Sequence, residues 1–296
     1  MKFAASAAAV FFCQQAFAVP VSGVTAVVTN GDLLITGTSG ADKVSVTEVG
    51  DGVWRVSGAG KTTINGQASV DLEVSGSIRV NLMEGNDSLY IHDGTVPRSL
   101  FVSMGDGNDT ATVTNLVIGQ PVVAGIIGVA DVPQVNVLSL SGDAGNDSLY
   151  VSGVQVLNSA NFTSIQSAIE GSTIAGGDGN DQIIVQNFQA PSLAVTGDSG
   201  KDQISLQLLS CGSLTVDGGD DTDKININAV TTGVMKVGAG ESNGDVLNVS
   251  GCRANVATFF DDGKKGTISG AFNVFGKWFA KGFSLNNLSV YSPSQK

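Results

Sequence analysis

A short acidic turn that recurs along the chain constrains the fold more than any other feature of the 296-residue sequence. Eight segments share a turn rich in Gly, Asn and Asp, followed by alternating apolar residues. The last Asp of each turn gives the series Asp42, Asp87, Asp109, Asp147, Asp181, Asp202, Asp223 and Asp245. Successive members differ in number by 45, 22, 38, 34, 21, 21 and 22. The sequence is therefore an array of repeats with a basic unit of about 21–22 residues.

Apolar residues alternate with polar ones on both sides of each turn, as in Leu193 and Val195 before one turn and Ile204 and Leu206 after it. This period of two is typical of strands with one buried face. A unit of two short strands cannot bury its apolar face alone, but copies stacked at ~4.8 Å form parallel ladders around a shared core. The sequence thus predicts an all-β fold, a parallel β-solenoid or β-helix with coils of about 21–22 residues.

Three spacings exceed one unit and predict interruptions. The longest, from Asp42 to Asp87, is close to two units, which leaves room for a degenerate coil without the turn. The spacings that end at Asp147 and at Asp181 correspond to one coil plus a lateral excursion each, over 114–135 and over 161–170. The second excursion has apolar residues at helical spacing and predicts a short helix.

The N-terminal part departs from the repeat. Lys2, an apolar stretch and Ala16-Phe17-Ala18 predict a signal peptide over 1–18, and therefore a secreted or cell-surface protein. No later apolar run is long enough to predict a transmembrane segment. Over 24–35, Asn30-Gly31-Asp32 predicts a hairpin. This segment and 54–64 are expected to form antiparallel ribbons that cap the first coil, so 19–75 is expected to hold the N-terminal strands and the first coil.

The C-terminal part changes character after the array, which is expected over 76–255. The last forty residues carry six Phe, Trp278 and five Lys, without a Gly-Asn-Asp turn. An open solenoid end exposes unpaired backbone, so an aromatic-rich cap is expected over 256–296. The alternative is a docking element that anchors the chain to polysaccharide, to another surface protein or to another copy.

The charge of the chain limits its partners. The chain has 27 acidic residues and 15 Lys and Arg, which gives a formal net charge of −12. This charge repels phosphate backbones and anionic membranes, so nucleic acid is not an expected partner. Cations are the natural small partners.

The turns resemble the haemolysin-type, or RTX, calcium-binding repeat. The segment GGDGNDQII over 176–184 matches the nonapeptide G-G-x-G-x-D-x-U-x at every fixed position. The resemblance implies a parallel β-roll in which Ca²⁺ lies between successive turns, held by Asp carboxylates and turn carbonyls. Copies here recur once per unit of two strands rather than every nine residues, so only one edge is expected to carry sites, as in dispersed repeats of bacterial secreted and surface proteins.

Physical chemistry also favours calcium at these turns. Carboxylates stacked ~4.8 Å apart repel each other by about 1 kcal/mol in water and by a few kcal/mol at a lower dielectric constant. Five turns add a second Asp three or four positions upstream, and paired carboxylates with turn carbonyls supply the oxygen ligands of Ca²⁺. The predicted ligands are Asp87, Asp106, Asn108, Asp109, Asp143, Asn146, Asp147, Asp178, Asn180, Asp181, Asp198, Asp202, Asp220 and Asp223. Asp42 and Asp245 lack the upstream partner and are poorer candidates. The affinity is expected to be weak, at ~10⁻⁴–10⁻³ M.

A metal-free interpretation stays open beside calcium. Each Asp or Asn side chain could accept hydrogen bonds from the amides of its own turn, a common structural use of these residues. Lys201 and Lys224 could also neutralise the acidic column locally. Zinc and copper are not expected, because the mature chain offers one His and two Cys. Cys211 and Cys252 lie almost two units apart, with Thr232 or a neighbour in the equivalent place between them, so they are expected to stay unpaired.

The expected function is that of a structural or adhesive module of the cell surface or extracellular matrix, associated with calcium. The runner-up is a calcium-dependent polysaccharide lyase or epimerase, since such enzymes resemble this chain in using a β-helix with Ca²⁺ and a basic residue. That chemistry needs a base beside the metal in a lined cleft. The four Arg residues lie away from the best-furnished turns, and no nucleophile or phosphate-binding motif is present, so no enzyme activity is expected.

Overall fold

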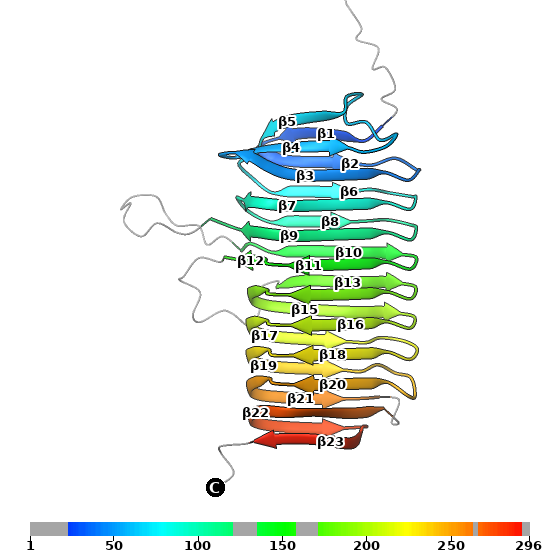
Figure 1. Ribbon diagram of the computed structural model, residues 1–296, viewed down its shortest axis with the longest axis vertical. Helices are drawn as coiled ribbons and strands as arrows, with labels where there is room; N and C mark the ends of the chain where they lie inside the picture. Colours follow the sequence, from blue (N-terminus) through cyan, green and yellow to red (C-terminus); the bar gives the residue numbers. More distant parts are fainter. Residues whose placement is uncertain (1–22, 121–134, 158–170, 263–265, 292–296) are drawn as a thin grey trace, which may run out of the picture.

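The computed structural model describes residues 23–120, 135–157, 171–262 and 266–291. Within these ranges the chain is all-β, and no helix is present, let alone one that could cross a membrane. The strands form one long, mostly parallel sheet (Figure 1). This arrangement is compatible with a β-solenoid. The expected signal peptide, the expected helix over 161–170 and most of the excursion over 114–135 lie outside the described residues.

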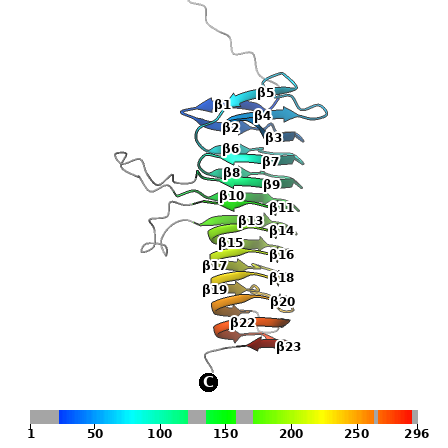
Figure 2. The same cartoon turned by 60° about the vertical axis from the view of Figure 1, so that its left-hand side comes forward.

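The strands lie in two columns that face each other, which the turned view separates (Figure 2). The first column contains β1 (Thr25–Thr29), β2 (Asp32–Thr36), β6 (Ile78–Asn81), β8 (Leu100–Ser103), β10 (Leu138–Ala144), β13 (Ser172–Asp178), β15 (Gln189–Ser199), β17 (Ser210–Asp217), β19 (Thr231–Gly238) and β21 (Arg253–Phe260). The second contains β5 (Ser69–Glu73), β4 (Val53–Gly58), β3 (Lys43–Gly50), β7 (Ser88–Val96), β9 (Thr110–Ile118), β11 (Ser148–Ser152), β14 (Gln182–Gln186), β16 (Gln203–Gln207), β18 (Lys224–Asn228), β20 (Val246–Ser250) and β23 (Ser284–Tyr291). The long β22 (Thr267–Lys281) pairs with β20 and β23 through its first part and with β21 through its second. The short β12 (Gln155–Val156) pairs with β9 and β15.

The strand register follows the spacing of the acidic turns. Gln182 of β14 pairs with Gln203 of β16, and Gln203 pairs with Lys224 of β18, so the residue number rises by 21 at each step. Ser148 of β11 pairs with Thr110 on one side and with Gln182 on the other, and these steps are 38 and 34. The two longer spacings therefore add residues without adding a strand pair, as the sequence predicts.

The longest spacing, from Asp42 to Asp87, has a different cause from the degenerate coil that we considered. Lys43 of β3 pairs directly with Ser88 of β7, and Leu33 of β2 pairs directly with Ile78 of β6. No strand lies between them. The additional residues form β4 and β5, which pair antiparallel outside β3. The gap is therefore one repeat that carries an antiparallel insertion.

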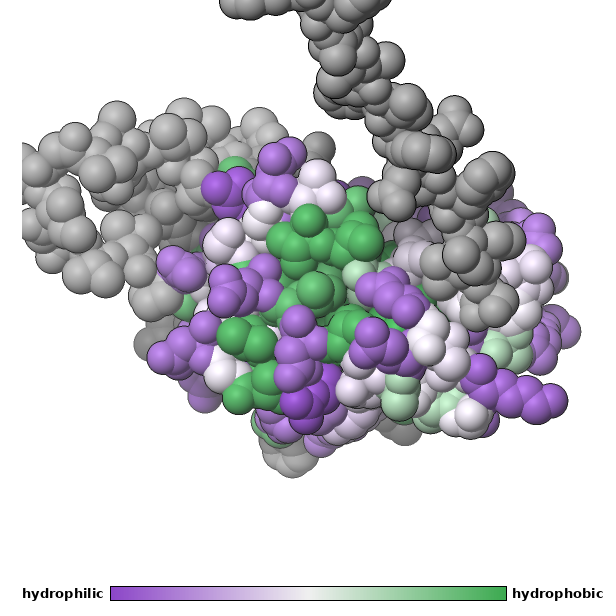
Figure 3. Space-filling view, turned by 90° about the horizontal axis from the view of Figure 1, so that it is seen from above, coloured by the Kyte–Doolittle hydropathy of each residue, from purple (hydrophilic) through white to green (hydrophobic). Residues whose placement is uncertain are grey.

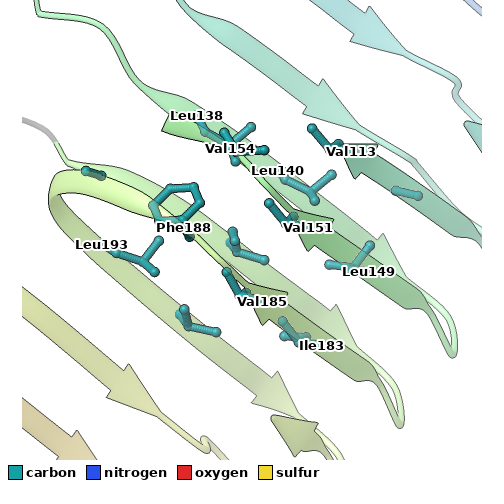
Figure 4. Packing of buried hydrophobic residues seen from close by; sticks show 14 of the residues in the cluster. Val113, Leu138, Leu140, Leu149, Val151, Val154, Ile183, Val185, Phe188 and Leu193 are labelled. Atoms are coloured by element: carbon teal, nitrogen blue, oxygen red, sulfur yellow. The ribbon is translucent and has the colours of Figure 1, made fainter. Parts of the chain in front are cut away.

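The core lies between the two columns and is filled by the inward residues of every strand. In β14 and β16 the alternation is strict, and Ile183 and Val185 of β14 and Leu193 and Val195 of β15 are at most 2% exposed. Figure 4 shows side chains of successive strands stacked on each other and aimed at the facing column. A fully buried aliphatic or aromatic side chain contributes about 1.5–3 kcal/mol, so this continuous core is the main stabilising element.

The N-terminal hairpin and the cysteines follow the sequence prediction closely. Thr25–Thr29 and Asp32–Thr36 pair antiparallel around Asn30 and Gly31, which have φ angles of 54° and 87°. The second expected ribbon is Val53–Gly58, paired on both sides. Cys211 and Cys252 are buried free thiols. Cys211 lies in register with Thr232, as expected, but Thr232 pairs with Ala254 rather than with Cys252.

Candidate metal site along the aspartate edge

The acidic turns connect the first column to the second along a single edge of the stack, on the right in Figure 1. Since every turn occupies the same place in its repeat, equivalent residues stack on each other. The last Asp of each turn forms a row that we call the aspartate ladder: Asp42, Asp87, Asp109, Asp147, Asp181, Asp202, Asp223 and Asp245. All eight side chains are buried, with exposures of 0–4%.

Hydrogen bonds between neighbouring repeats hold the aspartate ladder together. The backbone N–H of Asp147 donates to Oδ1 of Asp181 at 2.7 Å, and the N–H of Asp181 donates to Oδ1 of Asp202 at 2.8 Å. The same bond recurs at every other step, at 2.6–2.9 Å. The metal-free interpretation expected bonds within one turn. The structure shows instead that each carboxylate from Asp87 to Asp245 accepts from the turn of the preceding repeat, so the ladder bonds link the repeats.

The second carboxylate oxygen of the ladder has a different environment. In seven of the eight members, Oδ2 is buried without a hydrogen-bond partner among the described residues: Asp87, Asp109, Asp147, Asp181, Asp202, Asp223 and Asp245. In the first member the turn itself supplies donors, because Thr38 donates its N–H to Oδ2 of Asp42 at 2.7 Å and its hydroxyl at 3.0 Å. The seven other repeats present a row of buried oxygens with unused acceptor capacity, which is costly for an ionised carboxylate.

The pKa values of the ladder reflect this environment. Burial raises the pKa of Asp147 and of Asp223 to about 7, and that of Asp87 and Asp202 to about 6. The backbone hydrogen bond to Oδ1 opposes the shift in each case, and the charges of neighbouring Asp residues add to it. The ladder carboxylates therefore hold protons more tightly than isolated carboxylates do.

Glycine before the turn makes room for the ladder. A Cβ on Gly176 would overlap both Oδ2 of Asp181 and the carbonyl oxygen of Gly197. The following Gly177 has a φ of 106°, which only glycine adopts readily. The first glycine of the motif is thus required by close approach and the second by backbone conformation. Ala239 occupies the place of Gly176 in a later repeat, where the ladder Asp is the sixth residue after it rather than the fifth.

The upstream Asp residues, which we call the outer carboxylates, do not stack in the interior. They are Asp106, Asp143, Asp178, Asp198 and Asp220, and all except the half-buried Asp143 are exposed. Asp143 accepts hydrogen bonds from the hydroxyl of Ser141 at 2.6 Å, from the hydroxyl of Ser103 and from the N–H of Gly105. Their charges still raise the pKa of ladder members, as Asp198 does for Asp181 and Asp202. In each predicted pair of carboxylates, therefore, the ladder Asp is buried and the outer Asp is exposed or half-buried.

The predicted asparagine ligands form a second ladder on the surface. Oδ1 of Asn108 accepts the backbone N–H of Asn146 at 2.8 Å and its side-chain amide at 3.1 Å. Oδ1 of Asn146 accepts the same two donors from Asn180, and Oδ1 of Asn180 accepts the N–H of Lys201. Asn86, which the sequence interpretation omitted, begins this row by accepting from Asn108. These amide oxygens are engaged in bonds between repeats.

A pocket of about 320 Å³ lies beside the turns of the later repeats. Its acidic lining residues are Asp198, Asp217, Asp220, Glu241 and Asp262. The ring of Phe260 also lines it, with Nζ of Lys236 5.1 Å from the ring centre. Burial raises the pKa of Asp217. Three of these acidic residues were not among the predicted ligands: Glu241, which lies in the turn that ends at Asp245, and Asp217 and Asp262, which lie outside the turns. Neither Arg253 nor Lys201, the basic residues that a lyase could use, lines the pocket.

The donor chemistry of the aspartate edge fits a hard cation. Every group offered there is an oxygen, and each repeat from Asp87 to Asp245 leaves one carboxylate oxygen unpartnered in the interior. Within the described ranges, however, no three His, Cys, Asp or Glu side chains converge on one point. A cation at this edge would therefore have few carboxylate ligands.

Comparisons with protein-family models, with curated proteins and with solved structures find no match to this chain.

Proposed function

We propose that this protein is a secreted or cell-surface structural module, a parallel β-solenoid with coils of about 21–22 residues, whose aspartate edge associates with Ca²⁺. The observation that carries the proposal is the row of unpartnered, buried Oδ2 atoms along the aspartate ladder. The seven carboxylates repel each other, and their Oδ2 atoms have no hydrogen-bond donor among the described residues. A divalent cation supplies the missing positive charge.

Calcium would add stability rather than chemistry. Extracellular Ca²⁺ is millimolar, which matches the weak affinity that a single carboxylate with carbonyl ligands provides. Binding to the folded state alone stabilises it by about 1–2 kcal/mol for one site of this affinity at a few millimolar Ca²⁺. The resemblance to haemolysin-type repeats supports the same assignment through the turn of 176–184, and the predicted signal peptide supports export. No catalytic role is part of the proposal.

The contacts within the ladders favour a second candidate, a structural solenoid that needs no metal. Oδ1 of every ladder Asp after Asp42, and Oδ1 of the Asn row, already accept backbone amides. If the Oδ2 atoms carry protons instead of a cation, the turns are complete without a metal. Both candidates describe a stable extended scaffold, and they differ in the response to calcium.

Thermal unfolding in the presence and absence of calcium separates the two candidates. We expect the melting temperature of the chain in a chelator to rise by several degrees in 5 mM Ca²⁺, and much less in 5 mM Mg²⁺, which demands a stricter octahedral site. The measurement is circular dichroism at pH 7.5. A melting curve that is the same in chelator and in Ca²⁺ would support the metal-free scaffold.

A substitution in the aspartate ladder and a control substitution away from the turns assign the effect to the ladder. Asp181→Asn keeps the Oδ1 acceptor and removes the ladder charge, so it should reduce the calcium-dependent shift. Val234→Thr, on the exposed surface of β19, alters a side chain of similar size away from the turns and should leave the shift unchanged. Equal shifts in both variants would argue against the aspartate ladder as the binding site.

A further inference from the structure

The hydrophobic core is open at the C-terminal end of the stack. Strand register places Trp278 in the same inward row as Leu214, Met235 and Ala257, each of which is fully buried. Trp278 nevertheless remains 36% exposed, and the adjacent Phe279, which points to the outer face of the same edge strand, is 59% exposed. No described strand pairs with the outer edge of 277–281. The row of core residues thus ends in an aromatic surface.

The N-terminal end is open in the same way. Val28 lies opposite Leu33 in the inward row of β1 and β2, but it is 36% exposed, and its neighbour Val27 is 49% exposed. Val70 and Leu72 of β5 occupy inward positions and are only partly buried. Seen from this end, the molecule shows a contiguous hydrophobic surface between polar margins (Figure 3). Apolar surface of this kind marks an interaction site.

The charges at the C-terminal end have one sign. Over 266–291 the only charged residues are Lys277 and Lys281, and both are exposed. The N-terminal end carries both signs, because Asp71 of β5 pairs with Arg55 at 2.7 Å and the exposed Lys61 precedes the exposed Glu73. Two C-terminal ends brought together would repel, whereas an N-terminal end of mixed charge can face a C-terminal end without this repulsion.

We propose that copies of this chain associate head to tail, with the aromatic C-terminal end of one copy stacked on the N-terminal strands β1 and β5 of the next. The stacked ends continue the core from one copy into the other and cover strand edges that would otherwise remain open. Such an interface joins two different surfaces, so it propagates into an open-ended fibre rather than a closed dimer. The inference deepens the proposed structural role, and it does not depend on calcium.

Sedimentation velocity of the full chain over a range of concentrations tests the association. We expect the wild-type chain to form a concentration-dependent series of oligomers. Phe279→Asp and Val27→Asp each place a charge on one of the two ends and should each weaken association more than about tenfold, as substitutions of interface anchors do. Leu208→Asp is the matched control, since Leu208 is 52% exposed on a turn at the side of the stack and has a φ of 56°, which Asp tolerates.

Mixing the two end variants identifies the geometry. Phe279→Asp keeps a functional N-terminal end and Val27→Asp keeps a functional C-terminal end, so the mixture should form one-to-one dimers and nothing larger. Association of either variant with itself would overturn the head-to-tail arrangement. A monomeric wild-type chain, or an effect of Leu208→Asp equal to that of the end variants, would overturn the proposal. Running the series in chelator and in Ca²⁺ separates this outcome from the proposed calcium association, which is read from the melting temperature.

Discussion

Replacing one member of the aspartate ladder with alanine should lower the free energy of unfolding by about 2–3 kcal/mol, the cost of a buried polar group left without its partner. In Asp181→Ala the buried N–H of Asp147 loses the acceptor that it reaches at 2.7 Å, and a small cavity forms beside Gly176. Asp181→Asn keeps this acceptor and should cost less. The measurement is urea unfolding in chelator at pH 7.

The control for this prediction lies in the same turn. Asp178 is an exposed outer carboxylate three residues upstream, so Asp178→Ala should change the free energy of unfolding by less than about 0.5 kcal/mol. If Asp178→Ala and Asp181→Ala were equally stable, the ladder bonds would contribute little, and the core alone would hold the repeats together.

Acidification in the absence of divalent ions should stabilise the fold. The folded-state pKa is about 7 for Asp147 and Asp223 and about 6 for Asp87 and Asp202, against about 3.9 in an unfolded chain. Since the folded state binds these protons more tightly, the stabilisation is fully present below pH 3.9 and is lost as the pH rises through 6–7. We expect the free energy of unfolding in chelator to fall by roughly 2 kcal/mol or more between pH 5 and pH 8.

The doubly substituted Asp147→Asn, Asp223→Asn chain provides the comparison for the pH profile. Its dependence on pH over this range should be flatter, because the two groups with the highest pKa values no longer titrate. Denaturant unfolding at five pH values measures both chains. A wild-type chain that becomes more stable from pH 5 to pH 8 in chelator would contradict the environment that the structure gives to Oδ2.

The repeat spacing made most of the architecture predictable. The steps of 21, 34 and 38 along the sequence reappear as strand register, because parallel strands with one apolar face can pair only in the frame that keeps this face inside. The step from Asp42 to Asp87 was ambiguous. A segment of this length fits either two repeats or one repeat with an antiparallel insertion. Trp54 of the insertion is buried in the core, but nothing in the sequence around it indicates that it belongs to an insertion.

The candidate site was predictable in composition but not in orientation. The sequence shows two acidic residues in most of the turns, but not that one of them faces the interior while the other faces solvent. It also cannot distinguish a carboxylate bonded to its own turn from one bonded to the preceding repeat, such as Asp202 with the N–H of Asp181. The acidic pocket went unnoticed because Asp217, Glu241 and Asp262 come from three different repeats, and two of them, Asp217 and Asp262, lie outside the recurring turns.

The direction of the bonds between repeats has a mechanical consequence. The hydrogen bonds between paired strands and those of the aspartate ladder all run along the long axis of the stack. A force that pulls the two ends apart therefore opens the repeats one at a time, instead of shearing many hydrogen bonds at once. The shortest repeats, with a step of 21, would each release about 70 Å of extended chain, and the steps of 34 and 38 about 115 Å and about 130 Å. We therefore expect the molecule to unfold under force in successive short extensions at nearly constant force, which dissipates mechanical energy.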